Sequence, residues 1–186
     1  MIAPVVQVMD AGLDAVLDDR DRRQARRSLL TAEYARTLVQ LTMVVPGQCK
    51  DGTDISEAAR LGAARLERVL EGRALPVLHR ESWNGAAGPC FMWVLEADAA
   101  LVKGVTVGLE DGYSLGRLWD FDVYDARGSK LDREAVGSAA RTCFVCGSPA
   151  VVCAGRRLHG SAEVVRLFVG ILERGIAESK KKGDIE

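Results

Sequence analysis

Two aspartates stand one residue apart in an otherwise apolar stretch, residues 118–124 (LWDFDVY). Side chains alternate along a strand, so Asp120 and Asp122 share one face and lie roughly 6.5 to 7 Å apart along the backbone. Neighbouring carboxylates repel each other, and a divalent cation with oxygen ligands, such as Mg²⁺, or an arginine relieves that repulsion. The pair is therefore a candidate magnesium site. The alternative is an amphipathic strand whose polar face is solvated.

A second candidate site combines three of the five cysteines with a histidine. Cys143, Cys146, Cys153 and His159 have the spacing C-x₂-C-x₆-C-x₅-H. Three thiolates and one imidazole suit tetrahedral zinc, and the C-x₂-C pair supplies a chelating half-site. The alternative is a set of buried free cysteines and an unrelated surface histidine, because cysteine is often buried as a small apolar residue. Either way, an odd cysteine count argues against a secreted disulfide scaffold.

The composition limits which classes of protein this chain can belong to. The chain has 186 residues, of which 48% are apolar and 27% charged, which suits one globular domain over residues 1–186. With 25 basic and 26 acidic residues the net charge is -1, which gives no general argument for nucleic-acid binding. No stretch reaches the roughly 18 to 20 apolar residues of a membrane span, and residues 1–10 carry no basic leader. We expect a cytoplasmic protein that binds neither nucleic acid nor membrane.

Periodicity predicts the elements that position these residues. Apolar residues recur at helical spacing over residues 11–30 and again over 54–70. Asp54, followed by Glu57, predicts an N-terminal cap for the second helix. We also predict a strand at 38–45 and a hairpin of strands at 75–83 and 90–96. The segment at 98–110 fits either a helix or a strand, and we assign it as a helix. A final helix begins at Ser161 and ends in a frayed tail at 179–186. We predict an α+β fold, with a mixed or mainly antiparallel sheet flanked by helices.

Two regions offer groups that could hold anions. Five arginines fall within residues 20–27 and could clamp phosphates or dock an acidic partner, although Asp–Arg pairs on a solvated helix face would look the same. The loop at 46–52 (PGQCKDG) joins a strand to a helix N-terminus, which can hold an anion on free backbone N–H groups, as well as being a plain connection. Glu110 or Asp111 could add a third carboxylate to the aspartate pair, or be solvated loop acids.

Four stretches together resemble one known family. They are residues 20–26 (RDRRQAR), 45–51 (VPGQCKD), 115–123 (LGRLWDFDV) and the cysteine cluster from Arg141 to His159. In this order they are similar to the apo-citrate lyase phosphoribosyl-dephospho-CoA transferases, also called citrate lyase holo-acyl-carrier-protein synthases. The resemblance implies a nucleotidyltransferase-like fold and reaction.

The resemblance also implies substrates and roles. The substrates would be 2′-(5″-triphosphoribosyl)-3′-dephospho-CoA and a serine of the apo acyl carrier protein of citrate lyase, with diphosphate released. Asp120 and Asp122 would hold Mg²⁺ across the triphosphate. The candidates to grip phosphate oxygens are Arg23, Lys50 and Arg117, and Gly47 and Gly116 would permit close backbone approach.

Two other functions fit the same residues. One is a magnesium-dependent nucleotidyl or phosphoryl transferase with another substrate, which keeps the aspartate pair. The other is a non-catalytic interaction module stabilised by zinc, in which the cysteine cluster matters and the aspartates form a polar face.

Overall fold

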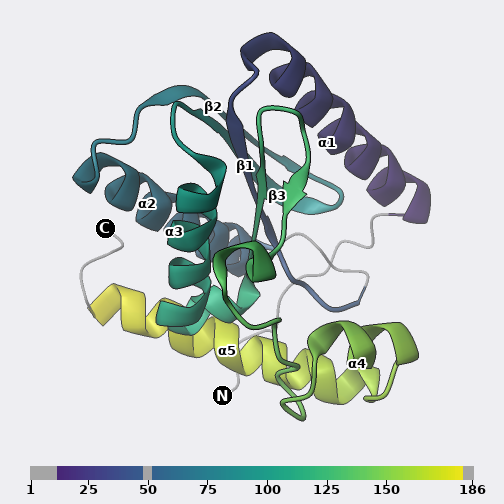
Figure 1. The fold of residues 1–186 in the computed structure, drawn as a ribbon. Helices are drawn as coiled ribbons and strands as arrows, with labels where there is room; N and C mark the ends of the chain where they lie inside the picture. The colour runs from purple at the N-terminus through teal and green to yellow at the C-terminus, as the bar shows by residue number, and fades with distance from the viewer. Residues whose placement is uncertain (1–11, 48–51, 182–186) are drawn as a thin grey trace.

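One five-stranded sheet lies at the centre of the fold. The computed structural model describes residues 12–47 and 52–181 (Figure 1). The strands are β1 (Thr37–Met43), β2 (Val77–Gly85), β3 (Gly88–Leu95), β4 (Trp119–Tyr124) and β5 (Lys130–Leu131). The helices are α1 (Leu13–Tyr34), α2 (Thr53–Gly72), α3 (Ala99–Gly112), α4 (Ala150–Arg156) and α5 (Ser161–Lys181), with two 3₁₀ turns, η1 (Ser114–Leu118) and η2 (Arg133–Val136).

The strand order is β2-β3-β1-β4-β5, and every pairing is antiparallel. The predicted α+β class with a mainly antiparallel sheet is therefore confirmed. Its description as nucleotidyltransferase-like stays a prediction. Among the described residues, no helix is long and apolar enough to cross a membrane.

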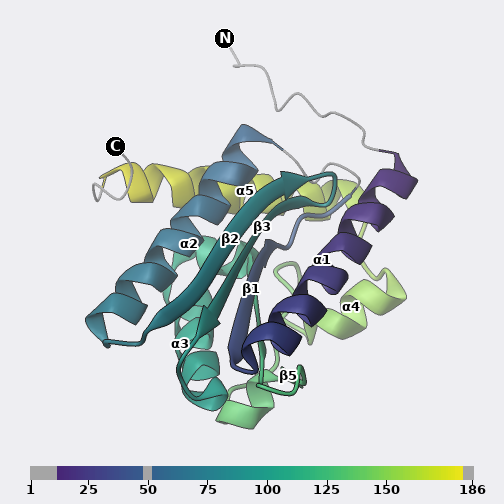
Figure 2. The same ribbon diagram turned by 90° about the horizontal axis from the view of Figure 1, so that it is seen from above.

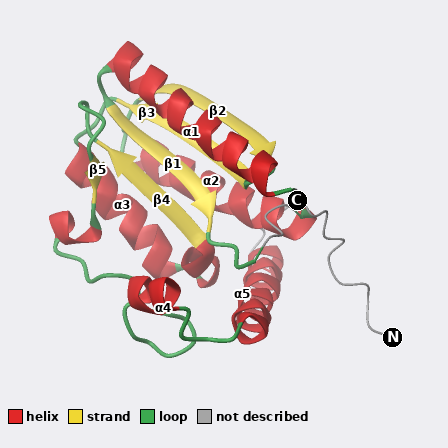
Figure 3. Cartoon of the chain, turned by 90° about the vertical axis from the view of Figure 1, so that its right-hand side faces the viewer, coloured by secondary structure: helices red, strands yellow, loops and turns green. Residues whose placement is uncertain are grey.

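The two faces of the sheet carry two separate apolar clusters. Helix α1 lies on one face, while α2 and α3 lie on the other (Figure 2). The smaller cluster lies under α1 and includes Leu30, Met92 and Tyr124. The larger cluster joins the opposite face to α2, α3 and α5. Figure 3 shows α1 in front of the strands with α2 and α3 behind them.

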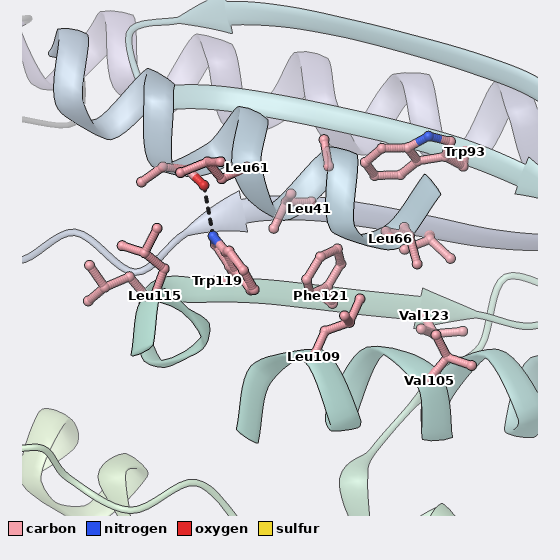
Figure 4. Close-up of a cluster of buried hydrophobic side chains, with 14 of the residues drawn as sticks. Leu41, Leu61, Leu66, Trp93, Val105, Leu109, Leu115, Trp119, Phe121 and Val123 are labelled. Carbon is pink, nitrogen blue, oxygen red and sulfur yellow. Dashed lines mark hydrogen bonds between the residues drawn. The ribbon is translucent and has the colours of Figure 1, made fainter. Parts of the chain in front are cut away.

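Strand β4 divides its side chains between these faces as predicted. Trp119, Phe121 and Val123 are buried in the larger cluster, close to Leu109 and Val105 of α3 (Figure 4). The indole N–H of Trp119 donates to the carbonyl oxygen of Ala58 in α2, at 2.8 Å. Because side chains alternate, Asp120, Asp122 and Tyr124 turn to the face that α1 covers.

An ion pair buried within helix α1 fixes the helix to the β2–β3 hairpin through its hydrogen bonds. Asp19 accepts from Arg23 at 2.8 Å and from the indole N–H of Trp83 at 3.0 Å. It also accepts the backbone N–H of Ala87 at 3.1 Å, within the turn between the strands. These contacts hold the turn of the hairpin against the helix.

Three local predictions have different outcomes. The ambiguous segment at 98–110 is a helix, because the carboxylate of Asp98 caps it by accepting the N–H of Leu101 at 2.9 Å. The capping role of Asp54 is wrong: α2 begins at Thr53 after Gly52, and no side chain caps it. The frayed tail at 179–186 stays a prediction: α5 runs to Lys181, Lys180 lies 3.7 Å from Glu57 of α2, and residues 182–186 fall outside the described residues.

We predict that Phe121→Ala lowers the free energy of unfolding by about 3–5 kcal/mol, because the ring is 1% exposed and its removal leaves a cavity between β4 and α3. Leu29→Ala, on a site that is 59% exposed, is the control and should change it by less than about 0.5 kcal/mol. Urea unfolding measures both. Equal effects of the two substitutions would contradict the burial of β4.

Candidate functional site

A cavity of about 440 Å³ opens beside the first half of β4. Three of the predicted site residues line it: Gly116, Arg117 and Asp120. The other walls come from the end of α3, from η2, from residues 139–144 and from α4. The described segments therefore bring the glycine, the arginine and the first aspartate of the LGRLWDFDV stretch to one place.

On the edge of β4 away from β1, charged side chains rather than a strand form hydrogen bonds with the backbone of Phe121. The partner of β4 on this outer side, β5, pairs only with Val123 and Tyr124. The N–H of Phe121 donates to the carboxylate of Glu110 at 2.8 Å, and its carbonyl accepts from Lys103 at 3.1 Å. An unpaired buried strand edge is costly, and these two side chains of α3 remove that cost.

Glu110 is the centre of a group of charges. It is 3% exposed and pairs with Arg141 and, at 3.3 Å, with Arg133. Burial raises the pKa of Glu110, and the charge of Arg141 opposes that shift most strongly. Arg133 also pairs with Asp111 at 2.6 Å. Arg141 also donates a hydrogen bond to the carbonyl oxygen of Trp119 at 2.7 Å.

Asp120 and Asp122 have different surroundings. The carboxylate of Asp120 is 42% exposed at the cavity and lies 3.6 Å from Arg141. Burial and the like charge of Asp122 raise the pKa of Asp120, and Arg141 opposes the shift. Asp122 is 16% exposed and pairs with Lys130 at 2.6 Å. It stands opposite Gln40 of β1.

Gly116 and Arg117 connect the cavity to the rest of the fold. A Cβ on Gly116 would overlap the backbone carbonyls of Leu109 and Glu110, so the close approach that this glycine permits is to the end of α3. Arg117 donates to the hydroxyl of Thr142 at 3.0 Å and to its carbonyl oxygen at 2.6 Å. This arginine therefore ties η1 to the start of the cysteine segment.

The remaining predicted phosphate contacts lie elsewhere. Arg23 is 7% exposed, and its guanidinium is bound to Asp19 and to the carbonyl oxygen of Gly88 at 2.6 Å. Gly47 follows β1 with φ of 81°, which favours glycine, and it does not line the cavity of the described chain. Lys50 falls outside the described residues.

The four predicted zinc ligands come together. The sulfur atoms of Cys143, Cys146 and Cys153 and a ring nitrogen of His159 all lie within 4.8 Å of one another. The Nε2 of His159 is buried and has no hydrogen-bond partner in the part of the chain that the structure describes. The N–H of Val145 points at the sulfur of Cys143 at 3.4 Å. This Cys₃His cluster is compatible with structural zinc.

The thiols of the cluster already differ in acidity. Hydrogen bonds from Ser148 lower the pKa of Cys146 to about 6. Desolvation raises the pKa of Cys153 to about 12, and the neighbouring sulfur of Cys146, 3.5 Å away, adds to that shift. Metal ligation needs thiolates, and these pKa shifts favour the thiolate of Cys146 over that of Cys153.

Comparison with known proteins shows the family of this chain. The family profile of apo-citrate lyase phosphoribosyl-dephospho-CoA transferase matches residues 11–174. The chain belongs to this family. A transferase of that name from Citrobacter koseri is 32% identical over 150 residues, which are 81% of this chain and 82% of the relative. Relatives from Escherichia coli O139:H28 and Shigella boydii serotype 18 are each 30% identical over 157 residues, 84% of this chain and 86% of theirs.

The match to this transferase family includes the cavity and the Cys₃His cluster. It also includes two arginines of the site that sequence reasoning did not select, Arg133 and Arg141. Sequence periodicity does not indicate either residue, because Arg133 and Arg141 pair with Glu110 across 23 and 31 positions of the chain, respectively. The available signals were the position of Arg141 two residues before Cys143 and the two acids that end α3.

We predict that Gly116→Ala lowers the free energy of unfolding by about 1–3 kcal/mol, because the new methyl group meets backbone atoms that cannot rotate away. Gly104→Ala in α3 is the matched control. Nothing lies within 4 Å of a Cβ there, so we expect a gain of about 0.5–1 kcal/mol from the better helix former. Thermal unfolding of both variants checks this, and an unchanged Tm for Gly116→Ala would refute the close packing of η1 on α3.

Proposed function

We propose that this chain transfers the phosphoribosyl-dephospho-CoA group from 2′-(5″-triphosphoribosyl)-3′-dephospho-CoA to a serine of the apo acyl carrier protein of citrate lyase. Membership of the family supports the choice of substrates. The observation that carries the proposal is the cavity at β4, where an exposed aspartate lies beside arginines that can face phosphate oxygens.

The reaction forms one bond and breaks one. The serine oxygen attacks the α-phosphorus of the triphosphate, and the bond from that phosphorus to the bridging oxygen breaks with its electron pair leaving on diphosphate. The serine proton passes to water or to a carboxylate. Such a step depends on in-line positioning and on neutralising the charge that grows on the leaving group.

The charges that line the cavity support the binding of an additional cation. Its described lining holds three arginines (Arg117, Arg133 and Arg141) and three carboxylates (Glu110, Asp111 and Asp120), so these charges cancel. A triphosphate chain with several negative charges would meet no net positive charge from this set. An additional cation at the aspartate pair would supply it.

Asp120 and Asp122 fit Mg²⁺ by their chemistry. Both offer carboxylate oxygens from the same face of β4, and their mutual repulsion contributes to the raised pKa of Asp120. When bound, Mg²⁺ would stabilise charge on the diphosphate leaving group. Arg117 and Arg141, which also line the cavity, would orient the phosphate chain, while Lys130 keeps Asp122 in place.

We predict that Asp120→Asn and Asp122→Asn each lower the rate of diphosphate release by about 100-fold or more, because the amide keeps the shape of the side chain but loses its charge. Both variants should stay folded, since removal of one of two repelling carboxylates costs little. Diphosphate release with apo acyl carrier protein, Mg²⁺ and the triphosphoribosyl substrate measures this.

The control for these variants is Asp132→Asn, an exposed aspartate outside the cavity lining, which should retain the wild-type rate. Near wild-type rates and an unchanged Mg²⁺ requirement in folded Asp120→Asn and Asp122→Asn would rule out the aspartate pair as the metal site.

We propose also that the Cys₃His cluster holds a structural zinc ion. The unpartnered Nε2 of the half-buried His159 supports this, because a buried ring nitrogen without a partner is costly and a metal would satisfy it. The segment has little other structure of its own: between Cys143 and His159 it contains turns, an isolated bridge from Pro149 to Thr142 and the seven residues of α4. A metal crosslink would therefore hold it in place.

We predict about one zinc per chain in purified protein, lost in Cys153→Ser and retained in Cys90→Ala. Cys90 is also fully buried, but it packs in the cluster under α1. Chelation should lower the Tm of wild-type protein because zinc binding contributes folding free energy. Elemental analysis and thermal unfolding measure these effects. Active protein without zinc would refute the site.

A further inference from the structure

One wall of the cavity is apolar and is not used by the phosphate chemistry. Phe144, Ala150, Val151 and Ala154 line it, on α4 and the turn before α4. Val151 is 77% exposed, so its packing contributes little to the stability of the fold. We call these four residues the α4 wall. Its surface is free to be covered by a ligand within the described part of the cavity.

The cavity thus offers two kinds of contact in one space. Arg117, Asp120 and Arg141 supply charged groups on one side, and the α4 wall supplies apolar surface. Its volume, about 440 Å³, is in the range of sites that bind small molecules through apolar walls and a few polar groups. A ligand that contacts both sides of the cavity would contain an ionised chain and an apolar group.

We propose that the α4 wall binds the adenine base of the substrate, while the arginine side holds the phosphate chain. This inference rests on the proposed transfer and adds to it the residues that select the nucleotide part of the substrate. A base offers a flat π face to Phe144 and an apolar contact to Val151, whereas a phosphate would lose hydration at either residue. The pantetheine arm is a weaker choice, because ordering a flexible chain costs more entropy than ordering a rigid ring.

The test compares two probes, dephospho-CoA and inorganic tripolyphosphate, by calorimetric titration of the full chain with Mg²⁺. Phe144→Ala and Val151→Ser should each raise the Kd for dephospho-CoA, Phe144→Ala by about 5-fold or more, as expected for loss of an aromatic platform. The Kd for tripolyphosphate should stay within about 2-fold. Val151 is exposed, so its variant should fold normally.

The matched control is Leu158→Ser, which changes an apolar residue that is 56% exposed near the same segment but outside the cavity lining. It should leave both Kd values unchanged. Unchanged binding of dephospho-CoA by the two wall variants, or equal weakening of both probes, would overturn the inference while the proposed transfer stands. Wild-type protein that binds neither probe would overturn both.

Discussion

The structure depends on the carboxylate of Glu110. This buried group accepts the N–H of Phe121 on the edge of β4 away from β1, where no described strand pairs with it, and it is bound by Arg133 and Arg141. One carboxylate therefore completes the sheet edge and positions two arginines of the cavity. Its burial would favour the neutral acid, as the raised pKa indicates, and the arginines act against this. Asp120 of β4 lies where this arrangement leaves the strand open to the cavity.

The Cys₃His cluster and the cavity belong to one arrangement. The cluster segment begins at Arg141 and Thr142, which bind Trp119 and Arg117, and it continues into α4, which forms the apolar wall. The segment thus touches the cavity on both its charged and its apolar side. A crosslink within the cluster would restrict how far these two sides can separate, which links a site remote from the aspartates to the shape of the cavity.

Local sequence pattern predicted much of the fold and part of the site. The features that it did not predict depend on contacts between distant segments. Alternation in residues 118–124 correctly placed Phe121 in the core and Asp120 on the other face. Arg23 shows the limit: its residue type suggested phosphate binding, but Asp19 and the hairpin at Gly88, 65 positions away, bind it inside the fold. The spacing of the cysteines predicted that they would meet His159, whereas nothing local connects Arg141 with Glu110.

The most direct test of the account is the intact mass of apo acyl carrier protein of citrate lyase after incubation with the wild-type chain, Mg²⁺ and 2′-(5″-triphosphoribosyl)-3′-dephospho-CoA. We expect the carrier to gain the mass of one phosphoribosyl-dephospho-CoA group, attached at a serine, with one diphosphate released for each carrier modified. An unmodified carrier, or a carrier that gains any other mass, would contradict the assignment of the cavity at β4 to this transfer.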